Sequence, residues 1–525
     1  MTMEVTLSSA TLGEDGRWEP PLGPLYIAST LEGCGVDVEF RDYQLCHDAN
    51  PFAPDALVEH LSGHRRVLLI SCFVDMLPVV IAATRRLVEA RPDTLVVLGG
   101  PGPTAGATQL MEHFPWITGI VKGEGEATVV EWVHSMKRSG PRRAIAGMVM
   151  RDGDDVMDGG NRPRVLAIDD LRPPAYHLVD WEQYTHARVI TTRGCPYRCS
   201  FCDVAALWGN KAAYRSLEKT IEEMLYLRTK HGRDAIAIVD DTFVLDRARV
   251  EDFCHRMIDV ASGVEWGCFG RINLMTPKLI ELMERAGCRA IFYGIDSGSP
   301  AILKRTIKSL KAESILPTVR ESAQAFDKTE ASFIWGYPFE ELDDFKRTLE
   351  LAGECSLLSP GVNVQMHMLS PLPNSPIYQE FGRELITPEP EDARWLLLPQ
   401  VLFDERSGEV REMVQSHPQL FPGFFNLPTP AKAKKREFLE KAMEALDRTV
   451  GDTLLDPAVS LLVEEHRPEV ERALLNAAAE PEDRIGVGLA VGFLRRCRRR
   501  NEHRNYPFEG NRGAAIVRER SRGRV

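Results

Sequence analysis

The sequence has little that would mark a membrane, exported or nucleic-acid-binding protein. It contains no apolar run of the roughly 20 residues that a membrane-spanning helix needs, and its N-terminus lacks a signal-peptide pattern. A net charge of −12 is the wrong sign for a nucleic-acid binder. The 11 cysteines are odd in number and mostly scattered, which argues against a disulfide framework. We therefore expect a cytoplasmic protein with no membrane span and no nucleic-acid partner.

The 525 residues are enough for roughly three domains. In residues 1–150, short apolar strands alternate with helical patterns, and the continuous apolar run Val67 to Ser71 is typical of a strand buried on both faces of a parallel sheet. This pattern predicts a doubly wound, Rossmann-like α/β domain. Glycine turns at 99–102 and 123–125 follow two of its strands, so they fall at the carboxyl edge where such sheets bind ligands. The strands are expected at 3–8, 36–41, 67–71, 94–98 and 119–121.

Three cysteines stand out from the scattered ones. Cys195, Cys199 and Cys202 form a C-x-x-x-C-x-x-C arrangement directly after a β-like run at 187–192. Thiolates suit iron–sulfur clusters, zinc or copper. A structural zinc site needs four ligands, and the next cysteine, Cys254, is about fifty residues further on. Three thiolates on a cubane cluster leave one iron open, so we interpret the loop as an open [4Fe–4S] site, with zinc as the alternative.

From residue 187 the strand–helix rhythm resumes and repeats six times. It predicts a partial, TIM-like (β/α)6 barrel over 187–384, with the active site at the carboxyl ends of its strands. Polar residues follow several of those strands, although a carboxylate there is also a common helix N-cap. We expect His367, on the last strand, to be a core residue rather than to face a substrate. The strands are expected at 187–193, 234–240, 265–270, 289–296, 330–336 and 361–368.

Two further regions complete the organisation. Residues 151–186 are rich in Asp, Gly, Arg and Pro, which indicates a linker with at most a short hairpin. Residues 385–525 show helical patterns at 431–449, 453–463, 468–478 and 483–500, and end in a basic tail from Arg495. We expect a mostly helical region that shapes substrate access at the barrel mouth, with a solvated tail.

The cysteine spacing, the aromatic Phe201 before the third cysteine and the order of strand-end residues resemble the radical S-adenosylmethionine (SAM) superfamily. The resemblance implies that the open iron binds the amino and carboxylate groups of SAM, and that an electron from a flavodoxin- or ferredoxin-like donor cleaves SAM to a 5′-deoxyadenosyl radical. Asp296 and Phe339-Glu340 depart from the family's usual Glu and Gly-Glu. The implied SAM contacts are Asp240 and Asp241 for the amino group, Arg271, Asp296 and Ser297 for the carboxylate or ribose, and Gly336, Tyr337 and Pro338 for the adenine.

Residues 1–135 resemble the cobalamin-binding domain that precedes many radical SAM domains. The resemblance rests on P-L-G-P-L-Y-I-A at 21–28, the strand that ends in Asp42-Tyr43, and the G-G-P-G-P-T and G-E-G-E turns. The implied cobalamin contacts are Asp42, Tyr43, Ser71, Cys72, Phe73, Gly99, Gly100, Pro101, Thr104, Gly123, Glu124, Gly125 and Glu126.

One histidine motif of cobalamin-binding domains is missing. The sequence has no D-x-H-x-x-G, and the loop from Ser9 to Glu19 contains no His. A motif histidine is therefore not available beneath the cobalt, and the resemblance implies a corrinoid whose dimethylbenzimidazole is displaced. Residues 72–75 are the candidates to lie beneath the metal.

Together these features predict a class B-like, cobalamin-dependent radical SAM methyltransferase that moves a methyl group from methylcobalamin to an unactivated carbon of a small molecule, such as a natural-product intermediate. No side chain is assigned a catalytic role. Ring rearrangement or cyclisation without methyl transfer remains open. A methylthiotransferase would need a second cluster on Cys34, Cys46 and Cys72, and a non-catalytic corrinoid sensor or zinc-stabilised module would not cleave SAM.

Overall fold

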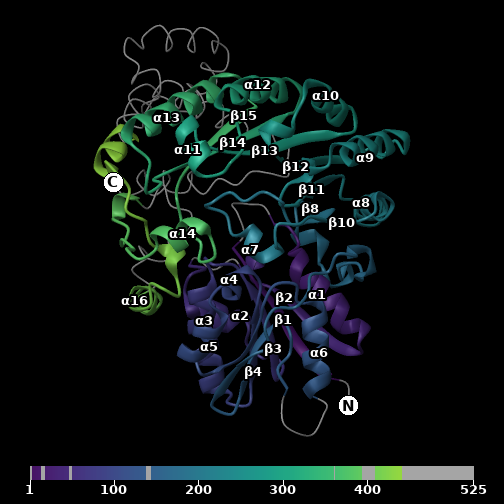
Figure 1. Ribbon diagram of the computed structural model, residues 1–525. Coiled ribbons are helices and arrows are strands. Elements are labelled where there is room, and N and C mark those ends of the chain that lie inside the picture. The colour runs from purple at the N-terminus through teal and green to yellow at the C-terminus, as the bar shows by residue number, and fades with distance from the viewer. Residues whose placement is uncertain are drawn as a thin grey trace, which may run out of the picture.

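The computed structural model describes residues 3–12, 18–46, 50–136, 143–359, 361–392 and 408–439. Two α/β units face each other, the N-terminal one in purple and blue and the second in teal and green (Figure 1). In the described part of the chain, no helix is long and apolar enough to cross a membrane.

The N-terminal unit is a seven-stranded sheet of order β2-β1-β3-β4-β5-β6-β7. The first five strands are parallel, and β6 and β7 add an antiparallel hairpin at one edge. Helices α2 and α3 pack on one face, and α1 and α6 pack together on the other (Figure 1). The strands are β1 (Met3–Ala10), β2 (Val36–Asp42), β3 (Val67–Cys72), β4 (Leu95–Gly99), β5 (Ile117–Val121), β6 (Met148–Asp152) and β7 (Asp155–Asp158), and the helices are α1 (Leu22–Gly33), α2 (Pro54–His60), α3 (Leu77–Ala90), α4 (Pro101–Thr104), α5 (Ala107–His113) and α6 (Glu126–Met136).

The predicted doubly wound domain is confirmed, but its sheet extends further than expected. The hairpin β6–β7 carries the sheet to Asp158, into the span that the sequence marks as a linker. The edge strand β7 has the sequence Asp-Val-Met-Asp and is not buried. With two aspartates in four residues, it lacks the apolar run by which the other strands were predicted.

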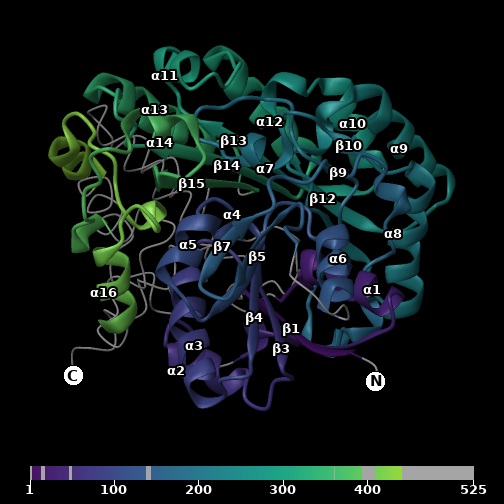
Figure 2. The same ribbon diagram turned by 60° about the horizontal axis from the view of Figure 1, so that its bottom comes forward.

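The second unit is an open sheet of six parallel strands in the order β15-β14-β13-β12-β11-β8, as expected for a partial barrel. Helices α8, α9 and α10 lie on its outer side (Figure 2). The strands are β8 (Ala187–Val189), β11 (Ala235–Ile238), β12 (Glu265–Gly270), β13 (Cys288–Asp296), β14 (Lys328–Trp335) and β15 (Val362–Met368), and the helices are α7 (Val204–Trp208), α8 (Leu217–His231), α9 (Arg247–Asp259), α10 (Pro277–Arg285), α11 (Pro300–Arg305), α12 (Ile315–Ala325), α13 (Leu342–Leu357) and α14 (Pro376–Phe381).

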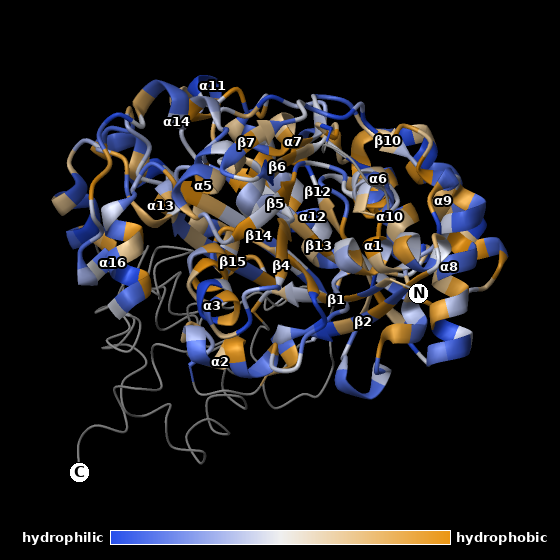
Figure 3. Ribbon diagram, turned by 90° about the horizontal axis from the view of Figure 1, so that it is seen from below, coloured by the Kyte–Doolittle hydropathy of each residue, from blue (hydrophilic) through white to orange (hydrophobic). Residues whose placement is uncertain are grey.

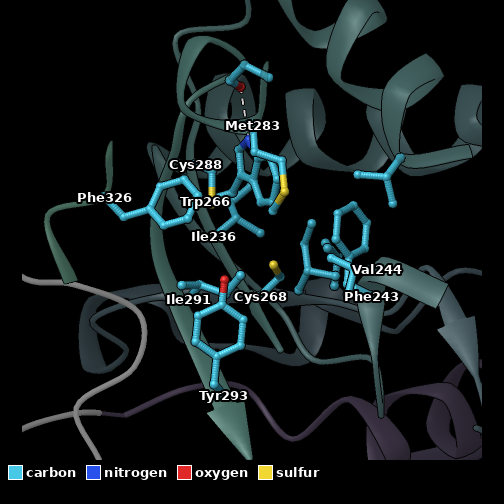
Figure 4. Close-up of a cluster of buried hydrophobic side chains, with 14 of the residues drawn as sticks. Ile236, Phe243, Val244, Trp266, Cys268, Met283, Cys288, Ile291, Tyr293 and Phe326 are labelled. Carbon is cyan, nitrogen blue, oxygen red and sulfur yellow. Dashed lines mark hydrogen bonds between the residues drawn. The ribbon is translucent and has the colours of Figure 1, made fainter. Parts of the chain in front are cut away.

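The core of the second unit lies between the strands and these outer helices. Trp266, Phe243 and Phe253 pack edge to face with ring centroids 5.4 Å apart, and the Trp266 indole N–H donates to the Ala286 carbonyl at 2.9 Å (Figure 4). Cys254, Cys268, Cys288 and Cys355 are buried, as expected for packing residues. Viewed from below, helices α8 and α9 carry both apolar and polar segments (Figure 3), the pattern of helices with one buried face.

Residues 408–439, the longer of the two described parts of the third region, contact both units. Helix α16 (Gly408–Ser416) packs against α3, and Val410, Phe421 and Phe424 join the core of the N-terminal unit. Residues 432–439 are helical, and Leu439 packs with Trp335 in the barrel. The other expected helices and the basic tail lie outside the described residues.

Candidate functional site

A cavity of about 1040 Å³ lies between the two units. Its floor is the carboxyl edge of the N-terminal sheet, and its opposite wall is the inner face of the barrel. The strand ends at which the sequence predicts cobalamin and SAM to bind therefore border the same cavity. None of the described residues of 408–439 lines it, and most of the region expected to cap the barrel lies outside the described residues.

The glycine turns of the N-terminal sheet leave room for a ligand. A Cβ added at Gly23 or Gly123 would meet no atom within 4 Å, and one added at Gly99 would meet only Val121, at 3.9 Å. These backbone positions therefore form a shallow cradle that fits the edge of a large flat group such as a corrin ring. The predicted cobalamin contacts that line the cavity are Ser71, Phe73, Gly99, Gly100, Pro101, Thr104, Gly123, Glu124, Gly125 and Glu126.

Three other predicted cobalamin contacts do not line the cavity. The Asp42 carboxylate accepts hydrogen bonds from the Tyr184 hydroxyl at 2.7 Å and from the Gln44 side chain at 2.5 Å. Burial raises the pKa of Asp42 to about 6. The Tyr43 hydroxyl donates to the Pro51 carbonyl, and Cys72 is fully buried in the core. All three instead hold the structure around the strand ends.

The loop after β3 also faces the cavity. Phe73, Val74 and Asp75 line it, and 54% of the Phe73 side chain is exposed. Among the described residues, the histidine that lines the cavity is His367, which comes from the barrel.

The cysteine loop lies between β9 (Thr192–Arg193) and α7. Cys199 is buried, with an Arg271 guanidinium nitrogen 3.8 Å from its Sγ, and the Cys195 Sγ is 3.7 Å from the Thr242 hydroxyl. Burial raises the pKa of Cys202 to about 12, whereas a coordinated metal deprotonates a thiol outright. In the described residues, no three metal-binding side chains converge on one ion. The three thiolates of a cubane bind different irons, so they need not converge.

The two aspartates after β11 act on this loop differently. Asp241 lines the cavity and accepts a hydrogen bond from the Gly194 N–H at 2.8 Å. Asp240 is buried and accepts from the N–H groups of Thr191 and Thr192 at 2.6 and 3.0 Å. Burial raises the pKa of Asp240 to about 6. Asp240 therefore anchors the start of the cysteine loop, while Asp241 faces the ligand space.

The other predicted SAM residues form a buried layer outside the cavity lining. Arg271 donates to the Lys308 carbonyl and stacks over the Tyr197 ring at 3.6 Å. Asp296 forms an ion pair with Lys308. The hydroxyls of Ser297 and Thr348 are 2.9 Å apart.

The turn after β14, which is the predicted adenine contact, is held by its own glutamate. Gly336 has a φ of 87° and donates its N–H to Glu340 at 2.8 Å. Tyr337 is fully buried, and Pro338 follows it. The third region then reaches this turn, because Lys435 Nζ lies 3.0 Å from a Glu340 carboxylate oxygen with both side chains fully buried. Lys435 is 95 residues away in sequence, and a lysine in a polar helical pattern gave no signal of this contact.

Arg193 joins the cysteine loop to the N-terminal unit. Its guanidinium donates to Glu124 at 2.9 Å and to Glu126 at 2.7 Å, and lies 5.1 Å above the Tyr26 ring. The guanidinium thereby gives each of the two buried carboxylates an ion-pair partner. The sequence singled out both glutamates but not their shared partner.

His367 is a correction. It lines the cavity and is half-buried, with its Nε2 3.2 Å from the Gln365 side-chain oxygen, so it is not the core residue that we expected. Asn363, Gln365 and His367 alternate with Val364 and Met366, and this period-two pattern was the signal that one strand face is polar.

Comparison with known proteins agrees with both halves of the site. The Radical SAM superfamily matches residues 189–352, and the B12 binding domain matches residues 10–133. An uncharacterized methyltransferase of Pyrococcus horikoshii is 27% identical over 352 residues, which is 64% of this chain and 74% of that protein. An anaerobic magnesium-protoporphyrin IX monomethyl ester cyclase of Cereibacter sphaeroides is 24% identical, over 84% of this chain and 74% of that protein.

A solved structure shares the fold. The radical SAM methyltransferase TsrM of Kitasatospora setae, with cobalamin and a [4Fe–4S] cluster bound, superposes with a TM-score of 0.63 at 16% identity, over 95% of this chain and 100% of that chain. The class is thus a radical SAM enzyme preceded by a B12-binding domain. The chain thus combines a B12-binding domain with a radical SAM domain, and the cofactors of these two domains are a [4Fe–4S] cluster, SAM and cobalamin. Such an enzyme needs a reductant and a small-molecule substrate.

Proposed function

We propose that the protein is a methyltransferase that moves a methyl group from methylcobalamin to an unactivated carbon of a small molecule. The observation that supports this proposal is the single cavity, because the corrinoid-facing turns and the cysteine loop border one space. When bound, the cluster with SAM supplies the 5′-deoxyadenosyl radical and the corrinoid supplies the methyl group. The reducing electron comes from a flavodoxin- or ferredoxin-like donor.

The protein's own contribution is to position the reactants. Cys195, Cys199 and Cys202 would hold the cluster, Asp241 would accept a hydrogen bond from the SAM amino group, and the turn at 336–338 would bind the adenine. Apolar walls keep water from the reacting carbon. Because a primary radical is reactive without help, orienting one C–H bond towards it is the main task of the enzyme.

The test begins with anaerobically purified protein reconstituted with iron, sulfide and cobalamin. We expect about four irons and one corrinoid per chain. With a chemical reductant present to bring the cobalt to Co(I), SAM with a deuterated methyl group should then transfer the label to the bound corrinoid and leave S-adenosylhomocysteine, even without a substrate. The triple variant Cys195→Ala/Cys199→Ala/Cys202→Ala should retain the corrinoid and lose the iron. Full iron content without bound corrinoid would contradict the proposal.

Cyclisation or rearrangement without methyl transfer is the second candidate, favoured by the cyclase relative. The two reactions differ in product mass. Methyl transfer makes the product heavier by one CH2 and carries the deuterium label, whereas cyclisation leaves the product unlabelled.

A further inference from the structure

The barrel wall of the cavity has two chemically different sides. Strands β14 and β15 place a polar stripe on the cavity, and apart from Ile334 the lining side chains in the middle of these strands are polar. From β13 to β11 the lining is apolar, and the Phe269 and Phe292 rings lie 5.2 Å apart at 55°. The polar stripe consists of Glu330, Ser332, Gln365 and His367, and the apolar side consists of Ile190, Ala237, Val239, Phe269 and Phe292.

The polar stripe is a connected hydrogen-bonded chain. The buried Glu330 carboxylate pairs with Lys328 at 2.5 Å and accepts from the Gln365 amide at 2.6 Å. The Gln365 oxygen then faces His367 Nε2 at 3.2 Å. Because each contact fixes the orientation of the next group, the stripe presents a preorganised set of polar atoms.

The charges around the cavity are mostly negative. Besides His367, its described lining contains two basic side chains, Arg188 and Arg193, and both are engaged by glutamates. Arg188 pairs with Glu19, and Arg193 pairs with Glu124 and Glu126. Lys328 is 1% exposed and lies behind Glu330, outside the lining. The acidic residues of the lining are Glu19, Asp75, Glu124, Glu126, Asp241 and Glu330.

We propose that the substrate is an amphipathic molecule, neutral or positively charged, with an apolar ring or chain against Phe269 and Phe292 and a hydroxyl or amine directed at Glu330, Gln365 and His367. A carboxylate or phosphate would lie next to buried carboxylates, in a lining whose two arginines are already paired with glutamates. The wall therefore repels anions, and its oxygen atoms accept hydrogen bonds from a hydroxyl or an amine of the substrate. This inference deepens the proposed function and rests on it for the reaction that follows binding.

Three matched probes test the inference on the reconstituted holoenzyme with SAM. They are 2-phenylethylamine, 2-phenylethanol and 3-phenylpropionate, which share an apolar ring and differ in the charge of the polar end. Equilibrium dialysis with mass-spectrometric detection gives each dissociation constant. We expect the amine and the alcohol to bind at least about tenfold more tightly than the carboxylate. Equal or tighter binding of the carboxylate, or no measurable binding of any probe, would overturn the inference.

A charge-neutral double variant tests which residues discriminate. Lys328→Met/Glu330→Gln removes the ion pair without leaving a buried unpaired charge, so the protein has no uncompensated charge to unfold it. We expect the preference for the amine over the carboxylate to fall at least about threefold. The control Lys432→Met/Asp392→Asn removes an ion pair of 2.6 Å outside the cavity lining and should leave the preference unchanged. An unchanged preference in the cavity variant would assign the selectivity elsewhere and contradict the role of Glu330.

The two proposals fail separately. Label transfer from SAM to the corrinoid, measured on the same preparation, reports on methyl transfer and does not depend on the probes. Label transfer together with tighter carboxylate binding would leave the methyltransferase standing and refute the substrate class. The expected probe ranking without corrinoid would do the reverse.

Discussion

The guanidinium of Arg193 lies 2.7 Å from the Glu126 carboxylate, although Arg193 ends β9 and Glu126 begins α6 of the other α/β unit. Arg193 directly precedes the cysteine loop, and Glu126 begins α6 at the carboxyl edge of the B12-binding sheet. The same guanidinium also pairs with Glu124. The position of the cluster loop relative to the corrinoid edge is therefore fixed by one buried, charged contact.

Removing the arginine alone should leave the buried Glu126 carboxylate without its ion-pair partner, whereas Glu124 keeps Arg164 at 3.6 Å. We expect Arg193→Met to destabilise the protein by about 3–5 kcal/mol, measured by denaturant unfolding. The charge-neutral double variant Arg193→Met/Glu126→Gln should recover most of that loss. If the double variant is no more stable than the single one, unpaired charge is not the cause.

Filling the glycine cradle should expel the corrinoid and spare the cluster. Gly99→Leu adds a side chain to the cavity at a position without positive φ and without close neighbours. We expect corrinoid content to fall at least about tenfold with iron content unchanged, measured by absorbance and iron assay after reconstitution. Gly408→Leu is the matched control, because a Cβ there also meets nothing within 4 Å and lies outside the cavity lining. A Gly99→Leu protein that loads corrinoid normally would mean that the ring sits elsewhere.

Lys435 should control SAM affinity from outside the site. Lys435→Met leaves the Glu340 carboxylate, which holds the Gly336 N–H, buried and unpaired. We expect SAM to bind about tenfold more weakly, measured by equilibrium dialysis. Glu340→Gln/Lys435→Met should restore part of the affinity. Lys434→Met, at the exposed preceding position in the same helix, should have little effect, and an equal loss in this control would point to the helix rather than to the ion pair.

The stability of the protein should fall as the pH rises from about 4 to about 6. Burial raises the pKa of Asp42 to about 6, whereas an unfolded chain ionises this carboxyl near pH 4. Over this interval the unfolded state loses the proton first and is favoured, by up to roughly 3 kcal/mol for a two-unit shift. The pKa of Asp240 is raised in the same direction.

Asp42→Asn should remove part of that decline, measured as the difference in unfolding free energy between pH 4 and pH 7. Asp259→Asn, at an exposed position at the end of α9, serves as the control. A pH dependence in Asp42→Asn as steep as in the unsubstituted protein would refute the assignment.

The positions of the strands along the chain could be predicted because most strands are short apolar runs with clear ends. The run expected at 234–240 is β11 (Ala235–Ile238), and the run expected at 361–368 is β15 (Val362–Met368). A short hairpin was allowed for in the linker, but its pairing with the N-terminal sheet was not predicted, because an edge strand with two aspartates has little apolar signal.

Contacts between distant segments left no local signal. Arg193 precedes a glycine and a cysteine, and Lys435 lies among other charged helical residues, so neither position reveals a buried partner. The alternation of polar and apolar residues around His367 could have shown that one face of the strand is polar. The prediction failed because it considered His367 alone.

Because α16 packs on α3, the N-terminal unit cannot complete its core until the segment that contains α16 has been translated. The core of the corrinoid domain takes Val410, Phe421 and Phe424 from a segment made long after α3 (Leu77–Ala90) leaves the ribosome. Until that segment arrives, the outer apolar face of α3 is uncovered. A fragment that stops at the end of the barrel would therefore contain every residue of the cavity lining and still expose this sticky surface, which makes such a fragment prone to aggregate.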